Sequence, residues 1–302
     1  MSSSDQRGSE HVSNLASLPI LDGAAYFCIA HQQPFFDLPP WISLIDTGDF
    51  AAKTEAYNVS NYLKSFNYSP QNPKYLANEA ILLIEELVLR QRTNINRVCI
   101  LLHRKFVSAR KLGVEAQNFT SMQLVAPSEV TLTSSLLGGD SDFLTCFPLI
   151  FKQGIAWQYA VSHLIEDFLA LSKVAVECEA LPKLSFLDFC TDPYLIPGGG
   201  LVGMIPVELF LHCASMVRRL LIALQTSSFE PAMADDPFQG RAISFFIERL
   251  ISFHFITACR DNGLIFEDLS IEEDNVMPFF FGWVHTVKAD AELDPNFQAG
   301  TI

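Results

Sequence analysis

Short apolar runs and longer amphipathic segments follow one another along the chain. Short runs rich in aromatic and β-branched residues are typical of buried strands, and such runs occupy residues 24–31, 40–48, 97–106 and 122–127. The segment 72–91 has the apolar spacing of a helix, with Asn72 as a possible cap and Pro73 in its first turn. The first half of the chain therefore alternates predicted strands with a helix.

Amphipathic helices dominate the second half. Their apolar periodicity predicts helices at 154–181, 207–225 and 241–259, with a loop at 226–240. This order of elements predicts an α/β fold with a largely parallel sheet and a helical C-terminal portion. Residues 1–19 are polar and Ser-rich, which predicts a disordered tail, and residues 290–302 form a second polar tail. A single domain is expected over residues 20–289.

Polar residues directly follow two of the predicted strands. The run "YFCIAH" ends in His31, and "LLHRKF" places His103, Arg104 and Lys105 after the third strand. Ligands of parallel sheets bind beyond the carboxyl ends of the strands. An arginine and a lysine at that edge suit a phosphate or diphosphate, although many strands simply end in charged residues.

The helix "GRAISFFIERLISFHF", residues 240–255, carries charges in a strongly apolar segment. At about 100° per residue, its apolar residues cover one broad face. Arg241, Phe245, Glu248 and Ser252 form a narrow stripe opposite, and Arg249 lies at its edge. The stripe is either a solvated polar face or a set of side chains that points into a cleft.

A second cluster lies in "WQYAVSHLIED", residues 157–167. On a continuous helix, Tyr159, His163 and Glu166 share one face, with Asp167 beside them. This H-x-x-E-D pattern could supply a general base or part of a metal site. A solvated helix face is the alternative.

Two loops carry weaker signals. Asp140, Ser141 and Asp142 form a D-x-D sequence, the arrangement with which many sugar transferases hold Mn²⁺ or Mg²⁺ on a nucleotide diphosphate. The same residues also read as an acidic turn. The segment "PGGGLVGM", residues 197–204, lacks the spacing of a phosphate-binding loop and predicts a tight turn.

Composition narrows the function classes. The 302 residues carry a net charge of −14, so we expect no nucleic-acid binding, because an acidic surface repels phosphates. Seven scattered cysteines without a C-x-x-C pair, and no secretory signal, predict a reducing cytoplasm. The apolar stretch 196–217 contains prolines, glycines and Glu208, so a buried turn and core helix are expected there, and no transmembrane span. Neither G-x-S-x-G nor H-E-x-x-H occurs.

The order of these segments resembles the bacterial glycosyltransferase-like family of capsular polysaccharide synthesis, long catalogued as a domain of unknown function. The likeness covers roughly residues 24–255. It rests on "YFCIAH", "NPKYLANEAILLIEEL", "ILLHRKF", "WQYAVSHLIEDF" and "GRAISFFIERL". The resemblance implies a GT-A-like fold that binds a nucleotide sugar and transfers the sugar to a hydroxyl of a small-molecule or glycan acceptor.

The matching positions, together with the neighbouring polar residues, imply a set of site residues. Arg104 and Lys105 would stabilise the leaving diphosphate, and Glu166 or Asp167, with His163 nearby, would deprotonate the acceptor. The expected catalytic residues are His163, Glu166, Asp167 and Glu248. The expected substrate-binding residues are His31, Glu79, His103, Arg104, Lys105, Gln158, Tyr159, Arg241 and Arg249. Asp140 and Asp142 are the candidate ligands for Mn²⁺ or Mg²⁺.

The chain also departs from the family's pattern. His103 stands where a tyrosine is usual, "PGGGLVGM" replaces an Asn-Met-Phe segment, and Gln123 occupies the place of an expected acidic residue. Two further hypotheses follow from these departures. The chain could be a catalytically silent relative that serves as a binding subunit, or a repurposed relative in small-molecule biosynthesis.

Overall fold

A computed structural model describes residues 17–48, 57–65, 68–69, 77–116, 119–197, 201–262 and 281–288. The predicted tails at 1–19 and 290–302 lie outside these ranges, apart from residues 17–19. The predicted cap at Asn72 and Pro73 also lies outside the described residues.

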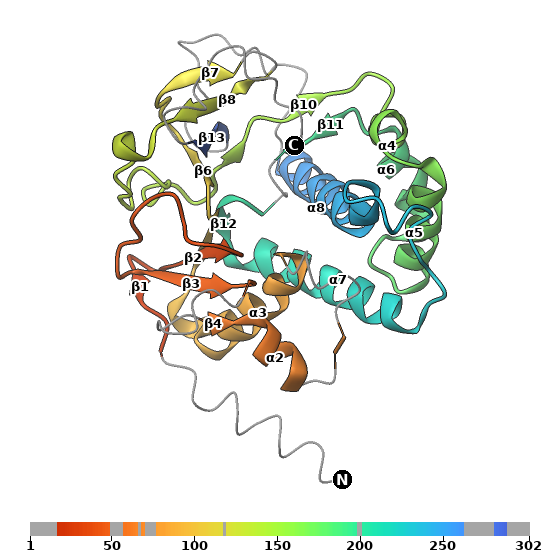
Figure 1. The fold of residues 1–302 in the computed structure, drawn as a ribbon, viewed down its shortest axis with the longest axis horizontal. Helices are drawn as coiled ribbons and strands as arrows, with labels where there is room; N and C mark the ends of the chain where they lie inside the picture. The colour runs from red at the N-terminus through yellow and green to blue at the C-terminus, as the bar shows by residue number, and fades with distance from the viewer. Residues whose placement is uncertain are drawn as a thin grey trace.

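An eleven-stranded mixed sheet runs through the described part of the molecule (Figure 1). Eight strands follow the order β4-β3-β2-β5-β6-β13-β8-β7, while β1, β12 and β9 pair with β2, β5 and β13. A second sheet pairs β10 (Leu149–Ile150) with β11 (Tyr194–Leu195). The strands of the main sheet are β1 (Ile20–Leu21), β2 (Ala24–Ala30), β3 (Ile42–Asp46), β4 (Tyr57–Asn58), β5 (Arg97–Leu102), β6 (Lys105–Ser108), β7 (Val114–Ala116), β8 (Phe119–Val125), β9 (Thr145–Cys146), β12 (Gly203–Pro206) and β13 (Phe281–Val287).

Parallel pairing organises the N-terminal half of this sheet. Strand β2 lies between β3 and β5 and is parallel to both, with Ile29 opposite Leu102. Every residue of β2 is buried, as expected of a strand covered on both faces. Antiparallel pairs occur where β6 turns back from β5, where β12 joins β5 and where β13 joins β6. The predicted α/β fold with a mostly parallel sheet is confirmed.

Helices surround the sheet and fill the C-terminal portion. Helices α3 and α7 pack against each other and against β2 and β5, while α4, α5, α6 and α8 form a helical cluster beside the sheet (Figure 1). The helices are α2 (Val59–Ser65), α3 (Ala77–Arg90), α4 (Ile155–Ser162), α5 (Ile165–Glu177), α6 (Phe186–Thr191), α7 (Val207–Thr226) and α8 (Ala242–Asp261), and a 3₁₀ turn, η5 (Gln239–Arg241), precedes α8.

The predicted helix at 154–181 is broken in the structure. It divides into α4 and α5 at His163, whose backbone is extended with φ −139° and ψ 173°. The chain bends because the His163 ring turns inward and stacks on Phe245 of α8, with ring centroids 4.0 Å apart. A tertiary contact therefore overrides a local helical pattern that contains neither glycine nor proline at the break.

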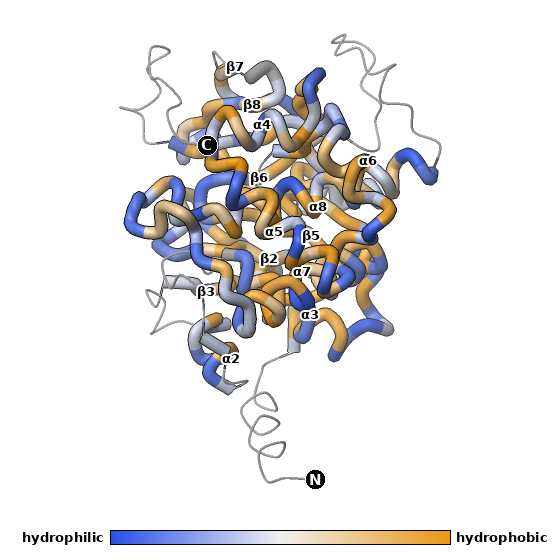
Figure 2. The backbone as a smooth tube through the Cα atoms, turned by 90° about the vertical axis from the view of Figure 1, so that its right-hand side faces the viewer, coloured by the Kyte–Doolittle hydropathy of each residue, from blue (hydrophilic) through white to orange (hydrophobic). Residues whose placement is uncertain are grey.

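Apolar segments gather in the interior, and hydrophilic segments lie toward the outside (Figure 2). Figure 2 shows the hydrophobic colouring concentrated along the central strands and helices. Within the stretch 196–217, residues 203–217 form β12 and the first half of α7 as a core element, while residues 198–200 of the predicted turn lie outside the described residues. Among the described residues, Gln239–Asp261 is the one helical stretch long and apolar enough to span a membrane, and 67% of its most apolar window is buried inside the fold.

Candidate functional site

Two histidines meet at the carboxyl edge of the sheet. Because β2 and β5 are parallel neighbours in register, the residues that follow them, His31 and His103, emerge side by side. Their rings meet edge to face with centroids 4.3 Å apart, and Phe35 flanks His103 at 6.1 Å. This edge therefore carries an aromatic group in which His31 and Phe35 are exposed.

Backbone hydrogen bonds hold the turn between β5 and β6. The His103 N–H donates to Ile29 O at 3.0 Å, and the Phe35 N–H donates to His103 O at 2.9 Å. The Val287 N–H donates to Arg104 O at 2.8 Å. The turn is thus fixed to β2, to the loop after β2 and to β13, which places His103, Arg104 and Lys105 at a defined position.

Cations concentrate around this turn. Burial lowers the pKa of His31, and the positive charges of Arg104 and Arg241 lower it further. Burial likewise lowers the pKa of Lys105, again with contributions from Arg104 and Arg241, while the Glu248 carboxylate opposes the shift. Arg241 comes from η5, over one hundred residues away in sequence, so the tertiary fold brings it to the sheet edge.

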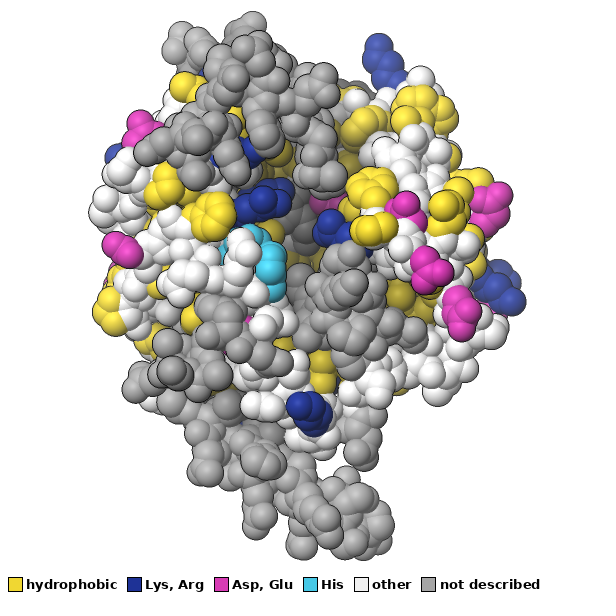
Figure 3. Space-filling model, in the orientation of Figure 1, with side chains coloured by type: hydrophobic (Ala, Val, Ile, Leu, Met, Phe, Trp, Pro, Cys, Tyr) yellow, Lys and Arg dark blue, Asp and Glu magenta, His cyan; other side chains and the backbone are white. Residues whose placement is uncertain are grey.

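The surface is hollowed where these elements meet. Figure 3 shows a hollow between the sheet and α8, with histidine, lysine and arginine side chains at its rim and acidic atoms deeper inside. Burial lowers the pKa of His103 to about 4, and neighbouring His31, Arg104 and Lys105 add to that effect. His103 is therefore a neutral imidazole at neutral pH, beside fixed positive charges.

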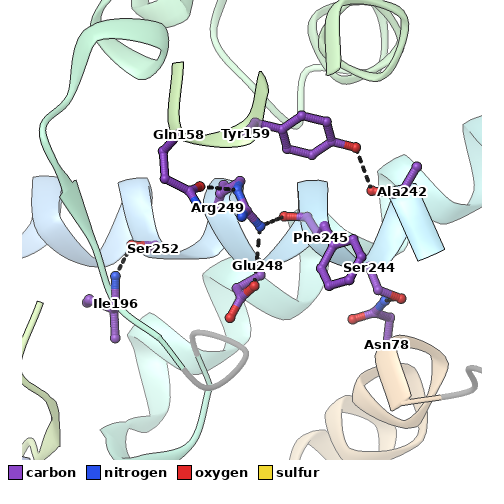
Figure 4. Close-up of polar contacts among 10 residues, drawn as sticks. All are labelled: Asn78, Gln158, Tyr159, Ile196, Ala242, Ser244, Phe245, Glu248, Arg249 and Ser252. Carbon is purple, nitrogen blue, oxygen red and sulfur yellow. Dashed lines mark hydrogen bonds and ion pairs between the residues drawn. The ribbon is translucent and has the colours of Figure 1, made fainter. Parts of the chain in front are cut away.

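The polar stripe of α8 faces the interior rather than bulk solvent (Figure 4). Phe245 and Ser252 are buried, and the Ser252 Oγ accepts a hydrogen bond of 2.7 Å from the Ile196 N–H. At the start of the helix, the Arg241 guanidinium lies 5.1 Å from the centre of the Phe245 ring. The interpretation of a solvated stripe is therefore wrong for this helix.

Arg249 is held on several sides. Its side chain is 4% exposed. The Nε donates to Gln158 Oε1 at 2.9 Å, and Nη1 donates to Phe245 O at 2.7 Å and to Glu248 Oε2 at 3.3 Å (Figure 4). The guanidinium carbon also lies 5.2 Å from the Tyr159 ring centre. Gln158 and Tyr159 of α4 thus meet α8 at this arginine.

Glu248 lies at the junction of these groups. Its side chain is 16% exposed and pairs with Arg249. The charge of the Glu248 carboxylate acts on two neighbouring groups. Burial raises the pKa of the Cys146 thiol, and the Glu248 charge raises it further. The same charge opposes the lowering of the Lys105 pKa. Glu248 therefore connects the α8 network to the cations of the sheet edge.

His163 and Tyr159 face the aromatic interior between α4 and α8. The His163 ring packs against the rings of Phe238 and Phe245, with centroids 4.8 Å and 4.0 Å away, and the two phenylalanine rings also contact each other at 5.1 Å. Burial lowers the pKa of His163 to about 4. Tyr159 is fully buried, and its hydroxyl donates to Ala242 O at 3.4 Å. Both side chains thus pack against the first turns of α8.

The two acidic residues of α5 differ in their surroundings. Asp167 is buried, and its Oδ1 accepts a hydrogen bond of 3.0 Å from the Ala232 N–H in the connection between α7 and α8. Burial raises the pKa of Asp167, an effect that this hydrogen bond opposes. Glu166 is exposed at the first turn of α5. The contact of Asp167 therefore anchors the loop that leads to Arg241.

Glu79 faces the packing between α3 and α7. Its side chain is 4% exposed, and burial raises its pKa to about 7, although the Tyr68 hydroxyl opposes the shift. Its neighbour Asn78 points toward α8, where Nδ2 donates to Ser244 Oγ at 2.8 Å (Figure 4). The first turn of α3 thus meets α8 through Asn78, one helical turn before Glu248.

Asp140 and Asp142 lie at the opposite edge of the sheet. Their loop is fixed by Arg97, whose Nη1 donates to Gly139 O at 2.6 Å and to Ser141 O at 2.9 Å. Arg97 begins β5 and Leu102 ends it, about 17 Å apart at about 3.3 Å per residue, so the loop is held at the other end of this strand from the cations. The residues described contain no group of three metal-ligating side chains. Asp140 and Asp142 do not fit a metal ion that bridges to a diphosphate at the cationic edge.

Several residues of this site escaped the sequence analysis. Phe35, Asn78 and Ser244 carry no motif, and Cys146 stands in a short apolar strand. Phe238 could have been noticed, because it lies beside Arg241 in a loop with few other aromatic residues. Strand β13 was also missed, although the run of aromatic and β-branched residues at 281–287 is typical of a buried strand.

Comparison with known proteins finds a solved structure of similar fold. No protein-family model and no curated protein matches the chain. Among solved structures, the apo structure of the WbbM bifunctional glycosyltransferase matches over 88% of this chain, with a TM-score of 0.51 and 10% sequence identity. The match covers 45% of that protein, so this chain spans less than half of its length. The chain therefore has a glycosyltransferase-like α/β fold.

Proposed function

We propose that this protein is a GT-A-like glycosyltransferase, related to the capsular polysaccharide family, that transfers a sugar from a nucleotide-sugar donor to a hydroxyl acceptor. The observation that carries the proposal is the group of cations at the carboxyl edge of β2 and β5. Lys105 experiences the charges of Arg104 and Arg241 and the opposing charge of Glu248, and His31 experiences the charges of the same two arginines. The fold of the chain that carries these residues is glycosyltransferase-like.

Like charges held close together in a protein disfavour one another. The lowered pKa of Lys105 expresses this, because burial and the charges of Arg104 and Arg241 both disfavour its ammonium form. A diphosphate would relieve that repulsion and would accept several charge-assisted hydrogen bonds. The same contacts would strengthen as negative charge develops on the leaving nucleoside diphosphate, which favours the transition state.

Glu248 is the best placed of the expected bases. His163 packs against two phenylalanine rings and Asp167 holds the connection between α7 and α8, whereas the charge of Glu248 acts on Lys105 at the cationic edge. In the proposed reaction Glu248 removes the proton of the acceptor hydroxyl, and the oxygen attacks the anomeric carbon as the bond to the diphosphate breaks. Each step uses residues of the cationic edge, and none passes through Asp140 or Asp142.

Arg104 provides the direct test of donor binding. Titration calorimetry with UDP, GDP, CDP and dTDP, each with EDTA and with Mn²⁺, identifies the nucleotide, and the corresponding nucleotide sugars are then assayed for turnover. Arg104→Ala should weaken binding of that nucleotide about 10- to 100-fold, the loss of a charge-assisted contact, without lowering the melting temperature. The exposed Lys173 of α5, which pairs with Glu177, provides the matched control as Lys173→Ala. Equal affinity in Arg104→Ala would refute this binding role.

A binding protein of the same fold is the second candidate. Two of the expected catalytic residues favour this candidate, because His163 packs against an aromatic ring and Asp167 accepts a backbone hydrogen bond, so both side chains have structural roles. Tight nucleotide binding without turnover of any donor would favour this candidate. In either case the cytoplasm is the proposed location, supported by seven cysteines that are all free thiols.

A further inference from the structure

Arg249 was expected to bind substrate, but its contacts suggest another role. We infer that Arg249 and Gln158 are positioning residues that set the carboxylate of Glu248 for proton removal. The inference rests on the proposed function, in which Glu248 is the base. In this inference, proton removal by Glu248 depends on the Arg249 guanidinium, which does not itself touch the substrate.

The guanidinium of Arg249 is immobilised. Three hydrogen bonds join it to Gln158 Oε1, Phe245 O and Glu248 Oε2, at 2.9, 2.7 and 3.3 Å (Figure 4). The Tyr159 ring lies close to its carbon atom. Burial lowers the pKa of Arg249, and the charges of Glu248 and Tyr159 oppose that shift. A side chain fixed in this way and 4% exposed is a poor candidate for direct contact with a ligand.

The cost of burying an arginine also favours a purpose other than helix packing. Removing a guanidinium from water is unfavourable, and well-packed apolar residues often replace buried ion pairs without loss of stability. The neighbouring contacts with α8 carry no second charge: the His163 ring stacks on Phe245, and the Tyr159 hydroxyl donates to Ala242 O. Another ion pair of the same helix, Arg260 with Asp192, keeps its arginine side chain 41% exposed. Arg249 is therefore the unusual case on α8, and it is next to Glu248.

A base needs a fixed direction and an ionised form. The groups around Glu248 are Arg249 on its own helix, Lys105 of β6 and Cys146 of β9. Lys105 belongs to the cations proposed to hold the diphosphate, so its charge is shared with the ligand. Arg249 keeps its position through Gln158 and the Phe245 carbonyl, and so supplies a positive charge on the carboxylate that does not depend on the ligand.

Gln158 contributes by fixing the guanidinium about its long axis. Its Oε1 accepts from Nε, the atom nearest the aliphatic stem of Arg249, while Nη1 points at Glu248 (Figure 4). Loss of this acceptor would leave the charge of Arg249 in place but allow its plane to rotate. A substitution of Gln158 therefore tests the orientation of the Arg249 guanidinium separately from its charge.

A double-mutant cycle tests the inference, with the donor of highest turnover among UDP-glucose, UDP-galactose, UDP-N-acetylglucosamine and GDP-mannose. Glu248→Gln should lower kcat about 100- to 10,000-fold, the usual contribution of a general base. Arg249→Lys should lower kcat about 10-fold with little change in KM, because the ammonium cannot reproduce the fork of donors. In the double variant, kcat should equal that of Glu248→Gln alone, since Arg249 acts through Glu248.

Two further variants exclude a merely structural role. Gln158→Met should lower kcat about 3- to 10-fold and keep nucleotide affinity. Arg249→Met should lower kcat at least as much as Arg249→Lys and keep nucleotide affinity, because the carboxylate loses its fixed neighbour while the donor site is untouched. Arg218→Lys, at the ion pair of Arg218 with Glu85 between α7 and α3, controls for the loss of an arginine elsewhere and should keep kcat.

The outcomes separate this inference from the proposed function. Multiplied losses in the double variant, or a nucleotide affinity that falls together with kcat in Arg249→Met, would overturn the positioning role while transfer by the wild type persists. Absence of turnover with every donor would overturn the proposed function itself. If Arg249→Lys does not fold, as thermal unfolding would show, Gln158→Met retains the arginine, and a kcat equal to that of the wild type would then overturn the inference.

Discussion

Glu79 offers a quantitative test of how the structure treats a buried acid. The side chain is 4% exposed in the packing of α3 against α7, and its pKa rises from 4.5 to about 7 because burial disfavours the carboxylate. The resemblance to the capsular family implied substrate binding for Glu79. The structure instead surrounds the carboxyl with Tyr68 and with the C-terminal end of α7, where Gln225 lies.

The size and sign of the effect follow from the two pKa values. Between pH 4.5 and about 7 the folded protein holds a proton on Glu79 that the unfolded chain has released, so the free energy of unfolding falls as the pH rises. The difference between 4.5 and about 7, at about 1.4 kcal/mol per pH unit, gives a loss of about 3 kcal/mol. That stability is fully present below pH 4.5 and lost once the pH exceeds about 7.

Glu79→Gln removes the titration and keeps the shape of the side chain. Urea unfolding of the wild type and the variant at pH 5 and pH 8 gives the free energy of unfolding of each. We expect the variant to gain up to about 3 kcal/mol relative to the wild type at pH 8, and distinctly less at pH 5. Other titrating groups cancel in this comparison. An equal difference between the two proteins at both pH values would refute the reasoning about burial.

Two further predictions concern His163 and Gly154. Burial lowers the pKa of His163 from 6.5 to about 4, so the folded protein loses stability as the pH falls from 6.5 toward 4. Measured by urea unfolding, His163→Phe should therefore lose about 2 kcal/mol less stability than the wild type between pH 7.5 and pH 5. An identical pH dependence in both proteins would contradict this. Gly154 precedes α4 with φ +89°, and a Cβ there would lie 2.6 Å from Cys190 O, so Gly154→Ala should lower stability by about 1–3 kcal/mol. Gly23→Ala, with φ +73° but only the Asn96 side chain nearby at 3.1 Å, should cost less in the same assay, and equal losses would count against the clash.

Burial of individual segments was predictable from local patterns. Strands β2, β3 and β5 and helices α7 and α8 lie where the apolar runs and periodicities predict them, within a few residues at each end. The carboxyl edge of the parallel strands was also the right place to look for cations, because register follows from the fold class. The break between α4 and α5 was not predictable, since it depends on the stacking of His163 against Phe245.

Which polar residues come together was decided by tertiary structure. Arg104, Lys105, Arg241 and Glu248 share one edge, whereas the loop of Asp140 is held by Arg97 at the other end of β5, and no local pattern distinguishes these charges.

Hydropathy is a property of each segment, so the sequence by itself determined which segments form the core and therefore the fold class. Contacts between residues more than one hundred positions apart depend on strand order and helix packing, including the insertion of β13 between β6 and β8. Only the tertiary structure therefore decided that Glu248 and Arg249 are interior partners on α8 and that Glu79 is a packing residue.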